Sequence, residues 1–334
     1  MRIYRIRCQV LPFLTGFVYL VFRPNLPTIL IDAGSGEGSC FSDILAGFET
    51  IKTEFEPSFN EKVDIQRIIL THTHIDHFGG VHDLKRLTNA EVWVHVYESR
   101  IVCSYNERAT VSHQMFKQYL RENGVHPNDI EPILNAFGFL PGRVRSTPVD
   151  HVLRGGETID SMKFLHLPGH SCGHLAILID NCLFSGDLIL SKTLTQIWPE
   201  TLIPHTGLTH YLYSINQLDE LAHHFEKEEK NLVIFPGHEE VIENVVRRIE
   251  IIRKSVERRN QSLLDILVRS ENGLNIHEIS KKMYLTSHIN RTFFALCDVG
   301  CRVEYLQQNG KITVANYDQL DCMAYPVYLF QNCQ

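Results

Sequence analysis

The stretch THTHIDHFGG, residues 71–80, places three imidazoles and one carboxylate within six residues and follows them with two glycines. The four side chains are His72, His74, Asp76 and His77. Protonated imidazoles at this spacing would repel one another, whereas a bound cation would use their lone pairs. Imidazole and carboxylate ligands without thiolate suit zinc, iron or manganese. The stretch therefore predicts a metal site, with zinc as the first choice and iron or manganese as alternatives.

The order of the four side chains favours two metal ions over one. His72 and His74 alternate along an extended segment, so they can point the same way. Asp76 and His77 lie past the following bend and are expected to face a neighbouring position. Four adjacent ligands are more naturally divided between two divalent ions than crowded onto one. Each ion then needs further ligands from elsewhere in the chain.

Other apolar strand patterns run into coordinating residues and supply those candidates. The pattern VDIQRIIL, residues 63–70, predicts a buried strand that leads directly into the His cluster. Three later candidates follow at LPGHSCGH, FSGD and FPGHEE, and they are His170, Asp187 and His238. Strand ends are where an α/β fold gathers a site. We therefore expect these residues to converge on the cluster.

The ordered set resembles the metallo-β-lactamase superfamily. THTHIDH matches the HxHxDH motif of that superfamily, and the three later candidates match its later ligands in order. Asp32 in LIDAGSG matches its early strand-end aspartate. The resemblance covers about residues 1–245. It implies an α/β fold, an αββα sandwich with a dinuclear centre between its sheets.

The resemblance also implies a role for each residue. His72, His74 and His170 would hold one metal, and Asp76, His77 and His238 would hold the other. Asp187 would bridge the two ions. Asp32 would orient a ligand imidazole through a hydrogen bond, with an ordinary turn residue before Gly34 as the alternative. Asp76 would also act in catalysis by orienting the nucleophile or moving its proton.

Around this site the sequence predicts two parts, residues 1–245 and residues 246–334. The first begins with a hairpin of two strands and includes a helical insertion at about 99–145, which we expect to roof the site. The apolar face of the insertion comprises Phe116, Tyr119, Leu120, Ile133, Leu134, Phe137 and Phe139. Residues 198–218 could add Trp198, His205 or His210 to the pocket rim, with simple packing as the alternative.

The second part is predicted to be winged-helix-like. Helical patterns cover 241–260, 258–268, NIHEISKKM with a cap at Asn275, and about 290–308. Asn309-Gly310 predicts a hairpin turn that starts a two-stranded wing. The linker helix carries a basic stripe, namely Arg247, Arg248, Arg253, Lys254, Arg258 and Arg259. Packing or dimerisation is the favoured role of this part, so a homodimer is expected, with RNA as the alternative partner.

Composition narrows the setting of the protein. Its 334 residues carry a formal net charge of −7, so the chain as a whole is not built to coat a phosphate backbone. Nine cysteines are scattered without a CxxC pair, which indicates reduced thiols and a cytoplasmic location. No run approaches the roughly 18 apolar residues of a membrane span. We therefore expect no membrane partner.

The site predicts metal-assisted hydrolysis by a hydroxide shared between two ions. An apolar lid favours a thioester, lactone or other small ester as substrate, whereas a β-lactam is least favoured. The basic stripe keeps an endoribonuclease or phosphodiesterase acting on single-stranded RNA as the main alternative. A non-catalytic metal-binding regulatory module is the third hypothesis, although such a module would not need all seven ligands.

Overall fold

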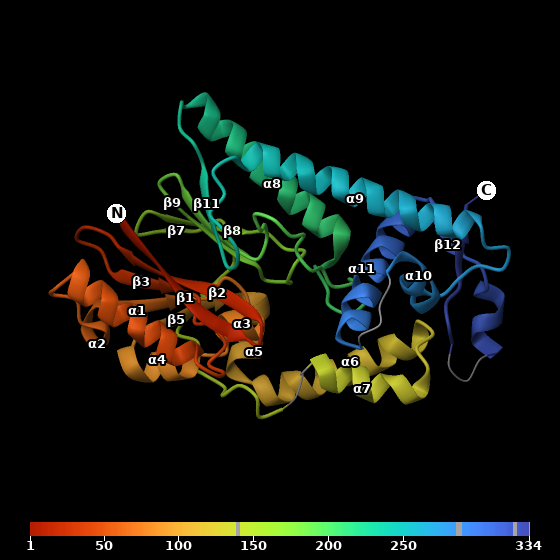
Figure 1. Ribbon diagram of the computed structural model, residues 1–334, viewed down its shortest axis with the longest axis horizontal. Helices are drawn as coiled ribbons and strands as arrows, with labels where there is room; N and C mark the ends of the chain where they lie inside the picture. Colours follow the sequence, from red (N-terminus) through yellow and green to blue (C-terminus); the bar gives the residue numbers. More distant parts are fainter. Residues whose placement is uncertain (138–140, 285–288, 323–325, 334) are drawn as a thin grey trace.

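The computed structural model describes residues 1–137, 141–284, 289–322 and 326–333. Two sheets face each other, and helices cover the outer face of each, so the predicted αββα sandwich is confirmed (Figure 1). The first sheet has the strand order β1-β2-β3-β4-β5-β6. Its strands are β1 (Arg2–Leu11), β2 (Leu14–Phe22), β3 (Thr28–Ile31), β4 (Ile65–Ile69), β5 (Glu91–His95) and β6 (His151–Leu153).

Strands β1 and β2 form the predicted hairpin, and β3 to β6 run parallel to one another. The carboxyl ends of β3 and β4 therefore lie at one edge, where Asp32 and the cluster at 71–77 follow them. Strand β5 ends at His95, earlier than the pattern EVWVHVYE predicts, because helix α5 (Val96–Cys103) begins there.

The second sheet has the order β11-β10-β9-β8-β7. Its strands are β7 (Thr158–Ile159), β8 (Met162–His166), β9 (Leu175–Ile179), β10 (Cys182–Gly186) and β11 (Val233–Pro236). Only β10 and β11 pair in parallel, which brings the ends of these two strands together. The core between the two sheets includes Ile31, Ile69, Ile177 and Phe184, all buried. Asp187 and His238 therefore follow the ends of two neighbouring strands, β10 and β11.

Helices shield both sheets from solvent. The first sheet is covered by α1 (Cys40–Glu54) and α4 (Val81–Thr88), with the short helices α2 (Glu61–Asp64) and α3 (Ile75–Phe78) at its ends. The second sheet is covered by α8 (Gly207–Lys227) and α9 (Val245–Val268). In Figure 1, α8 and α9 lie side by side along the upper face of the molecule.

The helical insertion packs against the C-terminal helices. It comprises α6 (Tyr105–Glu122) and α7 (Pro127–Phe137), which meet α10 (Ile276–Met283) and α11 (Ile289–Gln308) in one core (Figure 1). Five members of the expected apolar face are buried there, namely Phe116, Tyr119, Leu120, Ile133 and Leu134. The Phe137 side chain and Phe139 lie outside the described part of the structure. The insertion therefore joins the C-terminal part through a shared core.

Two predictions for the C-terminal part were wrong in detail. The separate helices expected at 241–260 and 258–268 are one continuous helix, α9, because Asn260 lies inside it without a break. Asn309-Gly310 ends α11 and does not form a hairpin turn. The Lys311 amide donates to the Leu306 carbonyl over 2.9 Å and Gly310 has a φ of 65°, a Schellman helix end.

A two-stranded sheet does follow, formed by β12 (Ile312–Val314) and β13 (Phe330–Asn332), with the 3-10 helix η1 (Tyr317–Cys322) between them. The predicted cap at Asn275 is present as a complete capping box with Glu278. The winged-helix assignment and the two-part division stay predictions. Among the described helices, none combines the length and apolarity needed to cross a bilayer, and the cytoplasmic location also stays a prediction.

Candidate metal centre

The HxHxDH segment changes conformation in its middle. His72 and His74 follow β4 outside any helix, and α3 begins directly after His74, whose backbone is extended with a φ of −73° and a ψ of 145°. Asp76 and His77 therefore stand on the first turn of a helix. This change from extended chain to helix sends the two pairs of side chains to different positions, as their order in the sequence predicts.

All seven predicted ligands come together in two groups. The first group contains His72, His74 and His170, and the second contains Asp76, His77, Asp187 and His238. In each group, one potential ligand atom per residue lies within 4.8 Å of the others. All of them except His74 and Asp76, which are half-buried, are less than one tenth exposed, so protein largely replaces water around the site.

Asp187 lies between the two groups. Its Oδ1 is 3.4 Å from Nε2 of His77, and its Oδ2 is 3.5 Å from Nε2 of His238 and 3.9 Å from Nε2 of His170. Among the described residues, the buried Oδ1 atom has no hydrogen-bond partner. A buried carboxylate oxygen without a hydrogen bond is costly, and a cation would remove that cost.

The first group offers neutral lone pairs. Burial, followed by the neighbouring imidazoles, lowers the pKa of His72, and burial and His170 lower the pKa of His74 to about 3. Burial also lowers the pKa of His170. The Nε2 atoms of His170 and His72 are only 3.1 Å apart. Two neutral imidazole nitrogens this close in a buried site match the donor set of a divalent transition metal.

The second group concentrates negative charge. Burial raises the pKa of Asp76, but His77 and His238 outweigh it and lower that pKa to about 2. Burial lowers the pKa of His238, but Asp187 and Asp76 reverse this and raise it to about 9. Without an ion, protons on imidazoles would therefore balance the carboxylates. The donor set fits a divalent cation in the place of those protons.

Backbone carbonyl oxygens contact the Nδ1 atoms of two of the imidazoles. Nδ1 of His170 is 2.7 Å from the Gln196 carbonyl, and Nδ1 of His238 is 2.7 Å from the Thr15 carbonyl. These contacts fix the ring nitrogen that carries the proton and leave Nε2 for a metal. His74 is contacted differently, because the Trp198 indole N–H donates to its Nε2 over 3.0 Å.

Asp32 contacts both His77 and the start of the cluster. It adopts a left-handed backbone with a φ of 62°. Its Oδ2 is 2.8 Å from Nδ1 of His77, and its Oδ1 accepts from the Thr71 amide over 2.8 Å. The Thr71 hydroxyl also donates to Oδ2 over 2.8 Å. Asp32 therefore lies where it can orient the His77 ring, and no turn runs from Asp32 to Gly34.

Gly237 lets two strand ends approach each other. A Cβ atom at this position would lie 2.4 Å from Cε1 of His77 and 2.7 Å from Oδ1 of Asp187. Any side chain would therefore displace residues of the centre. The glycine in FPGHEE thus has a steric role next to His238.

Glu98 is a site residue that the sequence prediction missed. It is buried in the first turn of α5 and accepts from the Thr73 hydroxyl over 2.6 Å and from the Gly173 amide over 3.0 Å. It thereby links the loop of His72 and His74 to the loop that follows His170. Burial raises its pKa. The available signal was a carboxylate two residues after the apolar pattern EVWVHV.

His174, His205 and His210 are not members of either group. His174 is fully buried, and its Nε2 accepts from the Asp187 amide over 3.2 Å, so it supports the backbone of that aspartate. His205 stacks on Tyr97, and His210 lies 2.9 Å from Glu200. Trp198, expected at the rim, is buried among Phe116 and Phe293 and reaches the centre through its contact with His74.

Comparisons of this chain with known proteins identify one family. A sequence model described as "Metallo-beta-lactamase superfamily" matches residues 11–238. The chain is 21% identical over 314 residues to "Probable metallo-hydrolase YqjP" of Bacillus subtilis, covering 90% of this chain and 91% of that protein. It is 24% identical over 240 residues to "Atrochrysone carboxyl ACP thioesterase" of Aspergillus fumigatus, covering 71% and 55%.

A solved structure has the same fold over nearly the whole chain. The metallo-beta-lactamase family protein TTHA1429 from Thermus thermophilus superimposes with a TM-score of 0.73 at 21% identity and covers 99% of this chain and 98% of that one. The similarity therefore extends through the helical insertion and the C-terminal helices.

Proposed function

Since the chain belongs to the metallo-β-lactamase superfamily and is a metal-dependent hydrolase of that group, we propose that it uses two divalent ions to hydrolyse a thioester or a small ester. The observation that carries this proposal is the position of Asp187 between two ligand groups. Zinc is the first choice for both ions, with iron and manganese as alternatives.

We assign His72, His74 and His170 to one ion and Asp76, His77 and His238 to the other, with Asp187 shared. Bound there, the ions would lower the pKa of water towards 7 and polarise the oxygen of the scissile bond. Asp76 is ionised at neutral pH, since its pKa is about 2, and it can accept a hydrogen bond from the attacking water. Its Oδ2 is 3.2 Å from Nε2 of His238, which keeps it at the centre.

Two observations support a thioester or other acyl substrate. One relative is named a thioesterase that acts on an acyl carrier protein. In addition, Phe13 is fully exposed at the tip of the β1–β2 hairpin, and Thr15 of the same hairpin contacts His238. An exposed aromatic ring two residues from the carbonyl that contacts His238 suits an apolar acyl chain.

The test compares substrate classes with the metal-loaded protein. The protein is loaded separately with zinc, iron and manganese, and initial rates are measured on an acyl-coenzyme A, a neutral S-acyl-N-acetylcysteamine, a γ-lactone and single-stranded RNA. Release of free thiol or acid at a kcat/KM at least about 100-fold above cleavage of RNA supports the proposal. Cleavage of RNA without cleavage of any ester or thioester would reject it in favour of the ribonuclease alternative.

A further inference from the structure

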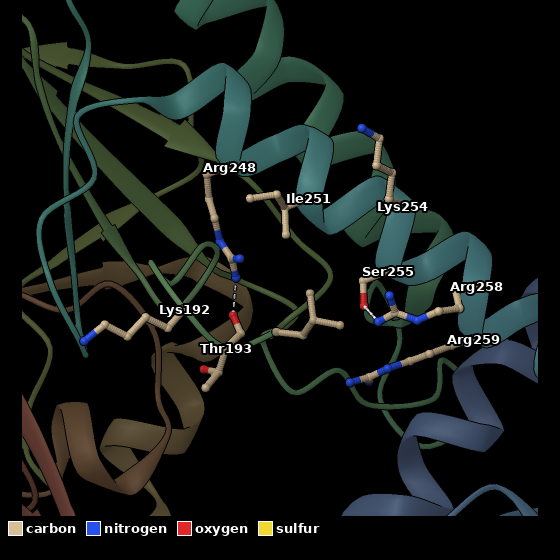
Figure 2. Close-up of a pocket in the computed structure, with 9 residues that line it drawn as sticks. Lys192, Thr193, Arg248, Ile251, Lys254, Ser255, Arg258 and Arg259 are labelled. Carbon is tan, nitrogen blue, oxygen red and sulfur yellow. Dashed lines mark hydrogen bonds between the residues drawn. The ribbon is translucent and has the colours of Figure 1, made fainter.

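A basic pocket lies between α9 and the loop that follows β10. It has a volume of about 610 Å³ and is lined by Lys192, Thr193, Leu194, Arg248, Ile251, Lys254, Ser255, Arg258 and Arg259. Five of the nine lining residues are cations, and none is a carboxylate. Figure 2 shows Arg248, Arg258 and Arg259 projecting from α9 on the side of the loop that carries Thr193. In a chain with a net charge of −7, this is a concentrated positive site.

The arginines at its centre are poorly neutralised by the protein. Arg248 is 6% exposed, and its guanidinium donates to the carbonyls of Leu190 and Thr193. Arg258 donates to the Ser255 hydroxyl over 3.3 Å. Within the described residues, neither arginine has a carboxylate within 4.0 Å. For the buried Arg248, a guanidinium without a carboxylate within 4.0 Å is unfavourable, and a bound anion would supply that partner. Arg258 is exposed and would add a second positive charge for the same anion.

Arg259 is only partly neutralised. It lies 3.4 Å from Oδ1 of Asp298, and that carboxylate also accepts two hydrogen bonds from Arg302. The single negative charge of Asp298 is therefore shared between Arg259 and the buried Arg302. The pocket keeps the capacity to neutralise several negative charges at once.

The loop wall of the pocket is also part of the metal centre. The Thr195 hydroxyl donates to the carbonyl of Asp187 over 2.8 Å, and the Gln196 carbonyl contacts His170. Glu239, next to His238, accepts from the amides of Lys192 and Thr193 over 2.5 and 3.1 Å. Gln196 comes three residues after Thr193, so their backbones lie at most ~11 Å apart. The pocket wall and the residues that support His170 and Asp187 therefore belong to one short loop.

We propose that this pocket binds the phosphate groups of a thioester carried on a phosphorylated pantetheine arm, while the acyl end lies at the metal centre. The inference rests on the proposed thioesterase function and names its substrate class. Guanidinium groups bind phosphate through paired hydrogen bonds, and the volume is in the range of small-molecule sites. A compact pocket suits one phosphorylated arm better than a long RNA strand, which needs an extended basic track.

The experiment compares a phosphorylated and a neutral thioester on the zinc-loaded full chain. The measured quantity is the ratio of the KM for acyl-coenzyme A to the KM for the same acyl group on N-acetylcysteamine. Loss of one charge-assisted contact in Arg258→Gln should raise this ratio about tenfold, and Lys192→Gln should raise it in the same direction. The control is Arg269→Gln, which removes an exposed cation one residue past the end of α9, about 16 Å along the axis from Arg258. It should leave the ratio unchanged.

The carrier and the proposed function are tested in the same series. An acyl group on phosphopantetheinylated carrier protein separates that source from free coenzyme A, since the substrate with the larger Arg258→Gln effect on kcat/KM is the one the pocket recognises. Cleavage of the neutral thioester by the unmodified chain tests the proposed function alone. An unchanged KM ratio in both pocket variants, or an equal rise in Arg269→Gln, would overturn the inference. So would steeply salt-dependent RNA binding that Arg258→Gln abolishes.

Discussion

The carboxylate of Asp32 lies 2.8 Å from Nδ1 of His77, although 45 residues of chain separate them. The two residues follow neighbouring parallel strands, β3 and β4, so the sheet itself brings them together. The contact determines which nitrogen of His77 carries the proton and thereby directs Nε2 towards Asp187 and Asp76.

Asp32→Asn should weaken the second metal position while leaving the fold intact. Asparagine tolerates the left-handed backbone at this position, but it is neutral and supports the His77 proton less well. We expect a loss of about 10- to 100-fold in affinity for one ion, measured by competition with a chelator. Asp180→Asn is the matched control, because Asp180 also has a positive φ, 54°, and is exposed. Equal metal affinity in both variants would refute the orienting role.

His74→Ala and Asp187→Ala should each abolish turnover with little change in far-UV circular dichroism. His74 belongs to one ligand group and Asp187 lies between both, so each loss removes a donor that no neighbour replaces. A fall in kcat of at least ~100-fold is expected. His224→Ala, at an exposed position of α8, serves as the control. Full activity in either site variant would be incompatible with the dinuclear assignment.

Removal of metal by a chelator should lower stability as well as activity. The second ligand group holds two carboxylates, Asp76 and Asp187, whose charges an ion would balance in place of protons on the imidazoles, so binding favours the folded state. At a free metal concentration about 1,000-fold above Kd, the loss amounts to about 4 kcal/mol. Thermal unfolding with and without chelator measures it, and elemental analysis of the loaded protein should give two ions per chain. A saturated stoichiometry of one would contradict the proposal.

Glu98→Gln tests whether the two ligand loops are linked through this side chain. The amide keeps the shape but has one acceptor oxygen, so it cannot accept from both Thr73 and Gly173 in the present geometry. The expected cost is about 1–3 kcal/mol in the free energy of unfolding, together with a lower kcat. Glu91→Gln, at an exposed position on β5, provides the comparison by urea denaturation. No difference between the two variants would show that Glu98 is dispensable.

Acid should weaken the C-terminal helices through Asp298. Burial raises the pKa of this carboxyl, but the hydrogen bonds and charge of Arg302 outweigh it and lower the pKa below its usual value. The pair therefore stabilises the fold fully above the unfolded pKa of about 3.9, and this contribution is lost as the pH falls through the lower folded pKa. Unfolding monitored between pH 2 and 7 should show this loss.

Arg302→Leu should cost about 3 kcal/mol at pH 7, because it removes the buried cation that donates two hydrogen bonds to the half-buried Asp298 and leaves Arg259 as the cation near that carboxylate. It should also flatten the acid dependence. Arg253→Leu removes a more exposed partner of Asp219 and should cost about 1 kcal/mol or less. Similar costs for the two variants would contradict the difference in burial.

Much of the centre could be predicted because its information is local. HxHxDH is a contiguous motif, and the later candidates lie at or shortly after the ends of apolar strand patterns, so the rule about strand ends together with the family resemblance brings them together. Glu98 and the contact between Trp198 and His74 could not be predicted in this way, since they depend on how segments far apart in sequence pack side by side.

The errors have similar causes. Asn309-Gly310 fits both a hairpin turn and a helix end, and the length of α11 decides between them. The apolar face of the insertion could be predicted from the sequence, but the surface against which it packs could not. That surface proved to be α10 and α11, along with Trp198.

Because α6 and α7 share one core with the C-terminal helices, the stability of each part depends on the other, although the two parts lie far apart in the sequence. Trp198 lies in that core and donates a hydrogen bond to His74, so damage to the C-terminal helices would disturb the metal centre through this indole ring. A chain shortened to residue 245 would expose the large apolar surface of α6 and α7 that the C-terminal helices cover, and it should aggregate. Nonsense or frameshift changes beyond codon 245 are therefore expected to inactivate the enzyme as thoroughly as changes in its ligands.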